Sequence, residues 1–291
     1  MNRRSFLKTI GFAAPIVMFL GHIPRLLWGG KWEHAQKTFW KDKRFHQNSV
    51  DMSGYSRGMI RARIDGQWRE YRMREASKEF AQWNTEKRLE FLRHIKAFMD
   101  KKKSDMPGLG GPHSGAVATY GLGRLDSQFT INNAIKGIGL APTDKNLDQA
   151  IGRLRQTYEN PMPEKMDVLK SLYENADFFD WRKQTSLELY ATPEFETHTF
   201  LNVMENPTAT LVFLDIPSYE LRTIARIIHP EDETALPSEK KLVEFVNLAH
   251  EYMHGKFPRQ YPLLLFYIVE EFDNTPGSKR GIRTVPELPE E

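Results

Sequence analysis

The sequence predicts a mainly α-helical fold with one small β-hairpin and an N-terminal membrane-anchor or signal helix. Three observations lead to this fold class. Apolar side chains recur every three or four residues in most segments between positions 85 and 272, which is the spacing of helices that bury one face. Residues 58–73 alternate instead between apolar and polar side chains around a tight-turn dipeptide. Residues 9–23 form an apolar stretch close to the start of the chain.

Composition sets the outer limits on function. The chain has 291 residues, 40% of them hydrophobic, so it is long enough for one or two domains with a sizeable core. It contains no cysteine. That excludes disulfides, thiolate zinc or iron–sulfur sites, covalent c-type haem and thiol catalysis within this chain. The sequence also lacks a nucleophile elbow, a P-loop and a dinucleotide fingerprint.

Charge is distributed unevenly along the chain. Residues 1–103 carry 23 Lys or Arg and 10 Asp or Glu, whereas residues 104–291 carry 18 and 28. The basic half adjoins the apolar N-terminal segment, so we expect membrane lipid or a protein partner to face it. No nucleic-acid motif accompanies the basic residues, so we expect no nucleic-acid partner. We divide the chain into a signal or anchor (1–30), a basic linker, hairpin and helix (31–105) and a helical domain with a C-terminal tail (106–291).

The N-terminus carries the most specific motif of the sequence. Paired Arg3 and Arg4, followed by Phe6 and Leu7, resemble the twin-arginine export signal. That resemblance implies that the chain crosses the cytoplasmic membrane already folded. No small-x-small cleavage site follows, so we expect an uncleaved anchor that holds the chain in the periplasm or at the outer face of the cytoplasmic membrane. Cleavage after residue 29 or 30 is the alternative.

Residues 31–124 are expected to contain a linker, a β-hairpin, a helix and a glycine-rich loop. Residues 31–57 have no period and are interpreted as a linker. In the hairpin of residues 58–73, apolar residues alternate with arginines, and Asp65-Gly66 supplies the turn. Residues 85–103 are expected to form a helix capped by Thr85, with lysines at its C-terminus. The glycine-rich segment 104–124 follows a helix rather than a strand, so we interpret it as a loop and not as a phosphate cradle.

The second half reads mostly as helices. Apolar stripes and capping residues predict helices over residues 144–158, 163–173, 194–204, 219–228, 238–254 and 261–272. Residues 208–214 are a short apolar run that is either a strand or a buried turn. Residues 274–291 are Pro-rich and charged, and are expected to form a tail.

One expected helix carries a motif of metal chemistry. His250 and His254 are four residues apart, so both imidazoles share a face and can bind one zinc ion. Glu251 would then be the general base that activates the zinc-bound water, and Glu270 is the near candidate for a third ligand. Lys256 stands where the zinc-peptidase pattern has a hydrophobic residue. A zinc-dependent metallohydrolase is therefore the alternative function, set against a helix face that merely carries two histidines.

The C-terminal block, residues 213–273, resembles the gluconate 2-dehydrogenase subunit 3 family. It has a segment ending Ile227-Ile228-His229-Pro230, a helix with Leu242-Val243-Glu244-Phe245-Val246-Asn247, and a final element ending Glu271-Phe272-Asp273. His229 interrupts the family's Ile-Ile-Pro pattern, and Asn247 replaces its Asp. The resemblance implies a helical, twin-arginine-exported subunit that accompanies a flavin-containing dehydrogenase and often a haem c subunit. It supplies no catalytic residue.

These observations lead to one expected function. The chain is expected to be a non-catalytic accessory subunit of an exported, membrane-associated redox complex. It would aid co-export, assembly or docking of a larger catalytic subunit. Flavin or haem would then lie in partner subunits, one of them a cytochrome subunit, and this chain would hold no cofactor or metal. A non-covalent haem b site using a histidine such as His198 stays open, since such sites leave no local motif.

Overall fold

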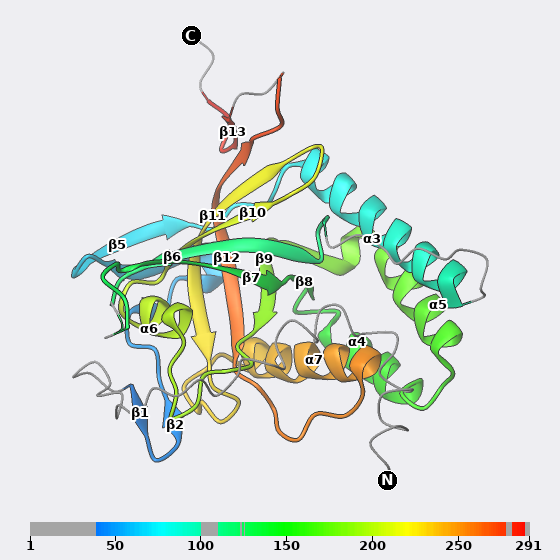
Figure 1. Cartoon of the computed structure of the whole chain (residues 1–291), viewed down its shortest axis with the longest axis horizontal. Helices are drawn as coiled ribbons and strands as arrows, with labels where there is room; N and C mark the ends of the chain where they lie inside the picture. The colour runs from blue at the N-terminus through cyan, green and yellow to red at the C-terminus, as the bar shows by residue number, and fades with distance from the viewer. Residues whose placement is uncertain (1–38, 100–109, 123, 125, 278–280, 289–291) are drawn as a thin grey trace.

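The computed structural model shows a mixed α/β fold built on an eight-stranded antiparallel sheet (Figure 1). The structure describes residues 39–99, 110–122, 124, 126–277 and 281–288. The expectation of a mainly α-helical fold is wrong, because segments between residues 114 and 285 contribute eight strands to one sheet. These strands are β6 (Ser114–Tyr120), β7 (Ile131–Gly137), β8 (Gly139–Pro142), β9 (Phe179–Leu187), β10 (Thr208–Phe213), β11 (Tyr219–Ile228), β12 (Leu263–Asp273) and β13 (Ile282–Val285).

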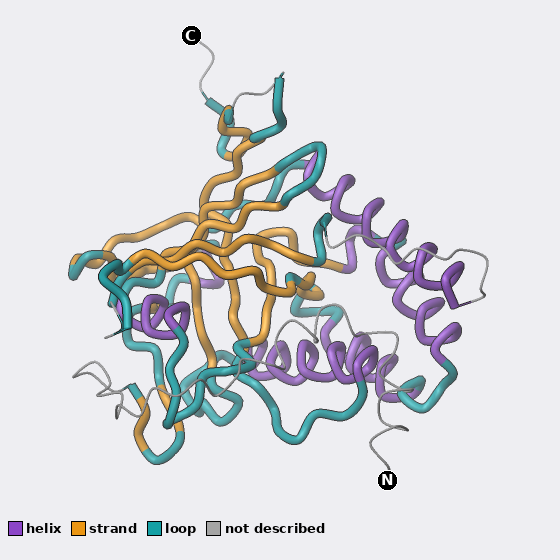
Figure 2. The backbone as a smooth tube through the Cα atoms, viewed as in Figure 1, coloured by secondary structure: helices purple, strands orange, loops and turns teal. Residues whose placement is uncertain are grey.

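The large sheet curls until its two ends come close together. Its strand order is β7-β6-β10-β11-β12-β9-β8, and β13 pairs with the C-terminal part of β12. β7 and β8 stand at opposite ends of this order, yet only Ile138 separates them in the chain. The sheet therefore bends into a half-barrel that brings both of its edges to the same place (Figure 2).

Two small sheets lie in the N-terminal part of the described chain. β1 (Trp40–Lys41) and β2 (Arg44–Phe45) form a short hairpin, and β3 (Val50–Asp51), β4 (Met59–Ile64) and β5 (Gln67–Arg72) form a three-stranded sheet. The predicted hairpin is confirmed: Ile64 pairs with Gln67, and Asp65 and Gly66 both adopt positive φ, 49° and 77°. The interpretation of residues 31–57 as a linker is wrong where these strands form.

A buried glutamine fixes the connection between these two small sheets. Gln47 is fully buried, and its Nε2 donates to the carbonyl oxygens of Val203 at 2.8 Å and Ala225 at 3.1 Å. Its Oε1 accepts from the backbone N–H of Ile227 at 2.9 Å. The segment that precedes β3 is therefore held by residues that lie far away in the sequence.

Five α-helices lie within the described residues: α3 (Lys78–Met99), α4 (Leu147–Gln156), α5 (Met162–Tyr173), α6 (His198–Glu205) and α7 (Pro237–His254). Single-turn 3-10 helices span Tyr55–Arg57 and Ala176–Phe178. α4 packs against α7 and α5 against α3, whereas α6 lies apart from both pairs and contacts β6 and β11 (Figure 1). The helices predicted over 144–158, 163–173 and 238–254 are confirmed within a few residues.

The central strands of the sheet bury both of their faces. Leu263 and Leu265 of β12 belong to a cluster that includes α4, α7 and the buried face of β4. Leu264 and Phe266, which alternate with them, belong to a second cluster that includes α6 and the start of α3. Each face of the same strand is thus covered by a different group of helices.

Two segments that were predicted to be helices are strands, and their burial on both faces explains why the prediction was wrong. Residues 219–228 form β11 and residues 263–273 form β12, which pair along their whole length with one bulge near Arg222. A strand that alternates between core and solvent shows a period of two, but a strand buried on both faces reads as a continuous apolar run. The run Leu263 to Val269 is of this kind, so the spacing of its apolar residues does not distinguish a strand from a buried helix.

The helix expected from residue 85 begins at Lys78 instead, so Thr85 is not its N-cap. Ser77 Oγ accepts a hydrogen bond from the N–H of Phe80 at 3.1 Å. Glu271, fully buried on β12, accepts from the N–H of Ser77 at 2.9 Å and from its hydroxyl at 2.5 Å. A carboxylate from a distant strand thus anchors the N-terminus of α3, where negative charge is stabilising.

The export signal and anchor cannot be placed in this fold. Arg3, Arg4, Phe6 and Leu7 lie outside the described residues, as does the whole of segment 1–30. Within the described part of the chain, no helix is long and apolar enough to cross a membrane.

Candidate functional site

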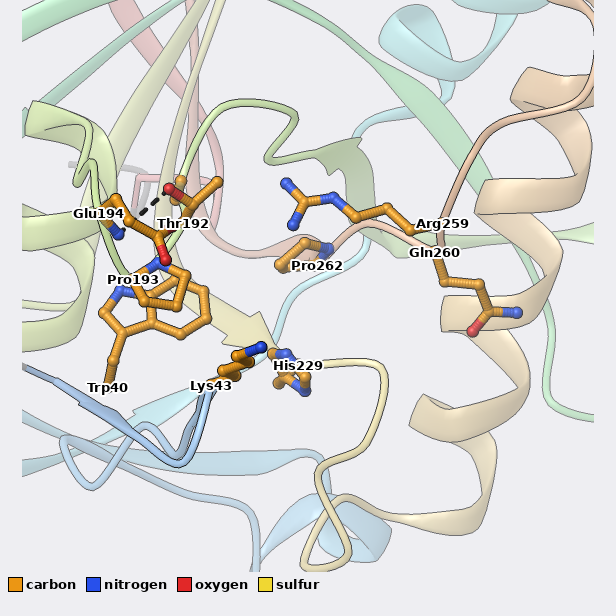
Figure 3. Close-up of a pocket in the computed structure, with 10 residues that line it drawn as sticks. Trp40, Lys43, Thr192, Pro193, Glu194, His229, Arg259, Gln260 and Pro262 are labelled. Carbon is orange, nitrogen blue, oxygen red and sulfur yellow. Dashed lines mark hydrogen bonds between the residues drawn. The ribbon is translucent and has the colours of Figure 1, made fainter.

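A pocket of about 260 Å³ lies at one rim of the large sheet (Figure 3). Because β9, β11 and β12 are antiparallel neighbours, the ends of β9 and β11 meet the start of β12 at this rim, where Leu263 pairs with both Leu187 and Ile228. The segments beyond these ends line the pocket together with the β1–β2 hairpin. The lining residues are Trp40, Lys43, Ala191, Thr192, Pro193, Glu194, His229, Arg259, Gln260 and Pro262.

The β1–β2 turn carries one cation to the pocket. Asp42 and Lys43 both adopt positive φ, 50° and 62°, as a two-residue hairpin loop of this length requires. Glycine or asparagine is the usual residue at such positions, so Lys43 occupies a conformation that lysine rarely takes. The hairpin is tethered by an ion pair between Arg44 and Glu231, 2.5 Å apart. Lys43 forms no ion pair with any of the described residues.

His229 follows β11 directly and contributes a neutral hydrogen-bond donor. Its Nδ1 accepts a hydrogen bond from the N–H of Glu231 at 3.1 Å, so the ring proton is on Nε2. Burial lowers the pKa of His229; the charges of Arg44 and Arg259 act in the same direction, and those of Glu231 and Asp232 oppose them. The rings of Trp40 and Phe45 pack edge-on against it, with centroids 6.0 and 5.2 Å away. His229 is therefore held rigidly in its neutral form near pH 7.

Arg259 is the second cation of the pocket. It lies in the loop that leads into β12, and its guanidinium extends towards Thr192 across the pocket (Figure 3). Its contact within the described residues is the ring of Tyr261, 5.2 Å from the guanidinium carbon, and no carboxylate pairs with it there. Gln260 lines the same rim but points away in this view.

The opposite wall combines one carboxylate with rigid backbone. Thr192 Oγ1 accepts hydrogen bonds from the N–H groups of Glu194 at 3.3 Å and Phe195 at 3.1 Å, which fixes the turn around Pro193. Glu194 is exposed and is the single acidic side chain among the lining residues. Two cations, one neutral imidazole and one carboxylate leave the pocket with one net positive charge. That arrangement can bind an anion, and it offers no activated nucleophile.

The structure brings two of the predicted zinc ligands together but not the third. The imidazole centroids of His250 and His254 on α7 are 6.2 Å apart. Glu251 instead accepts from the N–H of Phe257 at 3.0 Å, and Glu270 pairs with Arg222 and Arg283 on the sheet. Across the described residues, no group of three His, Asp or Glu side chains is placed to hold a metal ion. The zinc hypothesis therefore has no third protein ligand in this part of the chain.

His250 is expected to make the stability of the protein sensitive to acid. Its Nδ1–H donates to the carbonyl oxygen of Val246 at 3.0 Å, and burial lowers its pKa to about 4. Because the folded pKa lies below the ordinary value, the stabilisation is complete above pH ~6.5 and is lost as the pH falls towards 4. Replacing His250 by glutamine should remove about 2 kcal/mol of this pH dependence, measured by urea unfolding at pH 4.5 and 7.5. An unchanged pH dependence would contradict the assignment.

Comparisons with known proteins add little to this geometry. No protein-family model matches the chain, and no curated protein matches it either. One solved structure that it resembles is a protein of Clostridium acetobutylicum related to general stress protein 26 of B. subtilis, of the pyridoxinephosphate oxidase family. The TM-score is 0.30 at 11% sequence identity, over 67% of this chain and 94% of that chain.

The resemblance to gluconate 2-dehydrogenase subunit 3 is wrong. It requires a helix over residues 219–228 and another ending near Asp273, and both segments are strands of the curled sheet. Of the elements that carried the resemblance, only the helix with Val243 and Phe245 is present. A short helix-like pattern in the sequence was matched to a family whose architecture this chain does not share.

Most of the pocket was missed in the sequence. Lys43, Arg259 and Trp40 lie in segments that read as linker or loop, and His229 was noticed only as a departure from a family pattern. The available signal was His229 directly after β11, Arg259 four residues before β12 and Lys43 between β1 and β2. That signal has meaning only when β9, β11 and β12 are known to be neighbouring strands.

Proposed function

We propose that this chain is a non-catalytic binding protein that holds a small oxyanion, a carboxylate or phosphate group, in the pocket at the sheet rim. The observation that carries the proposal is the pair of cations, Lys43 and Arg259, which face one pocket and have no carboxylate partner within the described residues. An ammonium and a guanidinium left unpaired favour an anion between them, and a guanidinium can grip an oxyanion in bidentate fashion.

The other groups of the pocket suit this role. His229 can donate from Nε2 while its Nδ1 is occupied, and a neutral donor adds specificity without further charge. Trp40 is held by stacking on Phe200, with centroids 5.5 Å apart and planes 22° apart, so this wall is preformed. A preformed site loses less conformational entropy on binding. Glu194 disfavours highly charged anions, so a small ligand with one or two negative charges fits best.

The accessory role in an exported redox complex stays a prediction with less support than before. The family resemblance that suggested dehydrogenase and cytochrome partners is contradicted by the fold. What remains is the twin-arginine motif, which lies outside the described residues. A binding subunit of an exported assembly is compatible with the pocket, and flavin or haem would then belong to partner subunits.

Isothermal titration of the full chain in mild detergent tests the proposal with inorganic phosphate and succinate as separate probes. Dissociation constants on the order of 0.1–1 mM are expected, as befits ligands with few atoms. Replacing Lys43 or Arg259 by glutamine should weaken binding about tenfold each. Binding should tighten as the pH falls through the lowered pKa of His229, because protonation of its ring would add a positive charge.

Lys256 supplies the matched control. It is exposed and lies in the same loop as Arg259, but it does not line the pocket. Replacing it by glutamine removes the same charge and should leave both dissociation constants unchanged. The proposal fails if neither probe binds at about 10 mM. It fails equally if the Lys256 variant weakens binding as much as the Arg259 variant does.

A further inference from the structure

We propose that one end of the molecule docks on the head groups of an anionic lipid bilayer. The docking face consists of exposed aromatic and apolar side chains from two neighbouring turns, flanked by the arginines of β4 and β5. Its members are Arg61, Arg63, Trp68, Arg72, Tyr120, Phe129 and Ile131. It is separate from the oxyanion pocket and shares no residue with it.

The first step is that the two turns are adjacent. The β4–β5 turn is Asp65-Gly66, and Tyr120 at the end of β6 donates from its hydroxyl to Asp65 at 3.1 Å. Tyr120 pairs with Ile131 at the start of β7. The segment between β6 and β7, which contains Phe129, therefore lies next to the tip of the β4–β5 hairpin. Figure 1 shows both turns at the same end of the molecule.

The second step is the apolar exposure of this end. Phe129 is 70% exposed, Ile131 65% and Trp68 43%. Large apolar side chains that gather on a protruding surface mark an interaction site, whereas isolated ones need no explanation. Tryptophan is the side chain enriched where protein meets the membrane–water interface.

The third step is the charge. Residues 55–74 carry six arginines and two acidic residues. Register pairing places Arg61, Arg63 and Arg72 on the same outer face of the hairpin as Trp68 and one acid, Glu70, because Arg63 pairs with Trp68, Arg61 with Glu70 and Met59 with Arg72. Arg61 contacts Asp51 at 3.4 Å, and Arg63 and Arg72 have no ion-pair partner among the described residues. Unpaired guanidiniums are suited to lipid phosphates.

The shape and the chain path favour a bilayer over a folded partner. A stable protein–protein interface buries roughly 800 Å² on each side, which suits a broad surface better than two turn tips. A bilayer surface accepts a narrow amphipathic tip, with apolar side chains inserted and arginines at the phosphates. In addition, 38 residues precede Phe39, among them the apolar stretch of residues 9–23. Strand β1, which begins at Trp40, lies at this same end of the molecule (Figure 1).

The test uses the full chain reconstituted in vesicles of phosphatidylcholine, alone or with about one third phosphatidylglycerol. Acyl chains brominated near the head group quench tryptophan fluorescence on contact. The part of the quenching that is lost in Trp68→Phe reports on the docking face. This part should at least double when phosphatidylglycerol is present, and backbone hydrogen exchange over residues 59–72 should slow about tenfold.

The decisive variant replaces Arg61, Arg63 and Arg72 together by glutamine. It should abolish the effect of phosphatidylglycerol on both readouts. The matched control replaces Arg93, Lys145 and Lys256, three exposed cations elsewhere that have no ion-pair partner among the described residues, and should retain the effect. Circular dichroism shows that both variants are folded before either is compared.

Three outcomes overturn the proposal. Equal losses in both triple variants would show that total charge matters and this face does not. No dependence of either readout on phosphatidylglycerol would show that the face does not meet lipid. Concentration-dependent protection of residues 59–72 in detergent without lipid would assign the face to a second copy of the chain.

Discussion

Replacing Glu239 by leucine is expected to lower the free energy of unfolding by about 3–5 kcal/mol. Glu239 of α7 receives two hydrogen bonds from Arg226 of β11, with Nε to Oε1 at 2.5 Å and Nη2 to Oε2 at 3.1 Å. The two side chains are only 2% and 4% exposed. The variant leaves the arginine charge buried without a partner, which costs far more than the net value of the pair. Urea unfolding at pH 7 measures the loss.

Two further variants identify the cause. Replacing Arg226 by methionine in the Glu239→Leu background should recover most of the lost stability, because an apolar pair can fill the space of a buried ion pair. Glu244→Gln breaks a partly exposed pair between α7 and Arg155 of α4 and should cost less than about 1 kcal/mol. A double variant no more stable than Glu239→Leu alone would assign the loss to packing or to the helix cap that Glu239 gives Leu236.

Replacing Arg88 by methionine is expected to cost about 3–5 kcal/mol as well, for a different reason. Arg88 of α3 is 1% exposed and has no carboxylate partner among the described residues. Its guanidinium donates to Asn84 Oδ1 at 2.7 Å, to the carbonyl oxygens of Pro112 and Ile138 at 2.9 and 3.0 Å, and to His113 Nδ1 at 3.1 Å. Methionine fills the volume but leaves these buried acceptors unpaired.

The same helix offers the control. Arg93 lies five residues further along α3, is exposed, and has no ion-pair partner in the described part of the chain. Arg93→Met should change the free energy of unfolding by less than about 0.5 kcal/mol. Hydrogen exchange localises the damage: in Arg88→Met, amides around Ile138 should exchange faster than those of α7. Uniform acceleration across the whole chain would show that the contact is not local.

Local signals were sufficient for part of this fold. Asp65-Gly66 specifies its hairpin because the turn needs two positive φ values, and four residues determine that geometry. The helices that carry Leu154, Leu172 and Val246 were predicted because each has one apolar stripe and polar residues elsewhere. In these segments the buried side of the element can be read from the spacing of its own residues.

Other parts depend on neighbours that the sequence does not reveal. β11 and β12 are covered on both faces, so their alternation disappears. β9 was not predicted at all, since it buries Lys183 and Gln184 among its residues, and Lys183 needs Asp180 and Tyr55 to be stable there. The start of α3 depends on Glu271, far away in the sequence. The candidate pocket depends on three strand ends at once.

The attachment of Gln47 has a consequence for when the protein can finish folding. Its three partners belong to residues 203, 225 and 227, and neighbouring Ser49 donates to the carbonyl oxygen of Met204 at 2.8 Å. After residue 49 has been synthesised, almost 180 further residues must therefore be added before this segment can make its native hydrogen bonds. Until then, the segment between the two N-terminal hairpins lacks the residues that hold it in the folded protein.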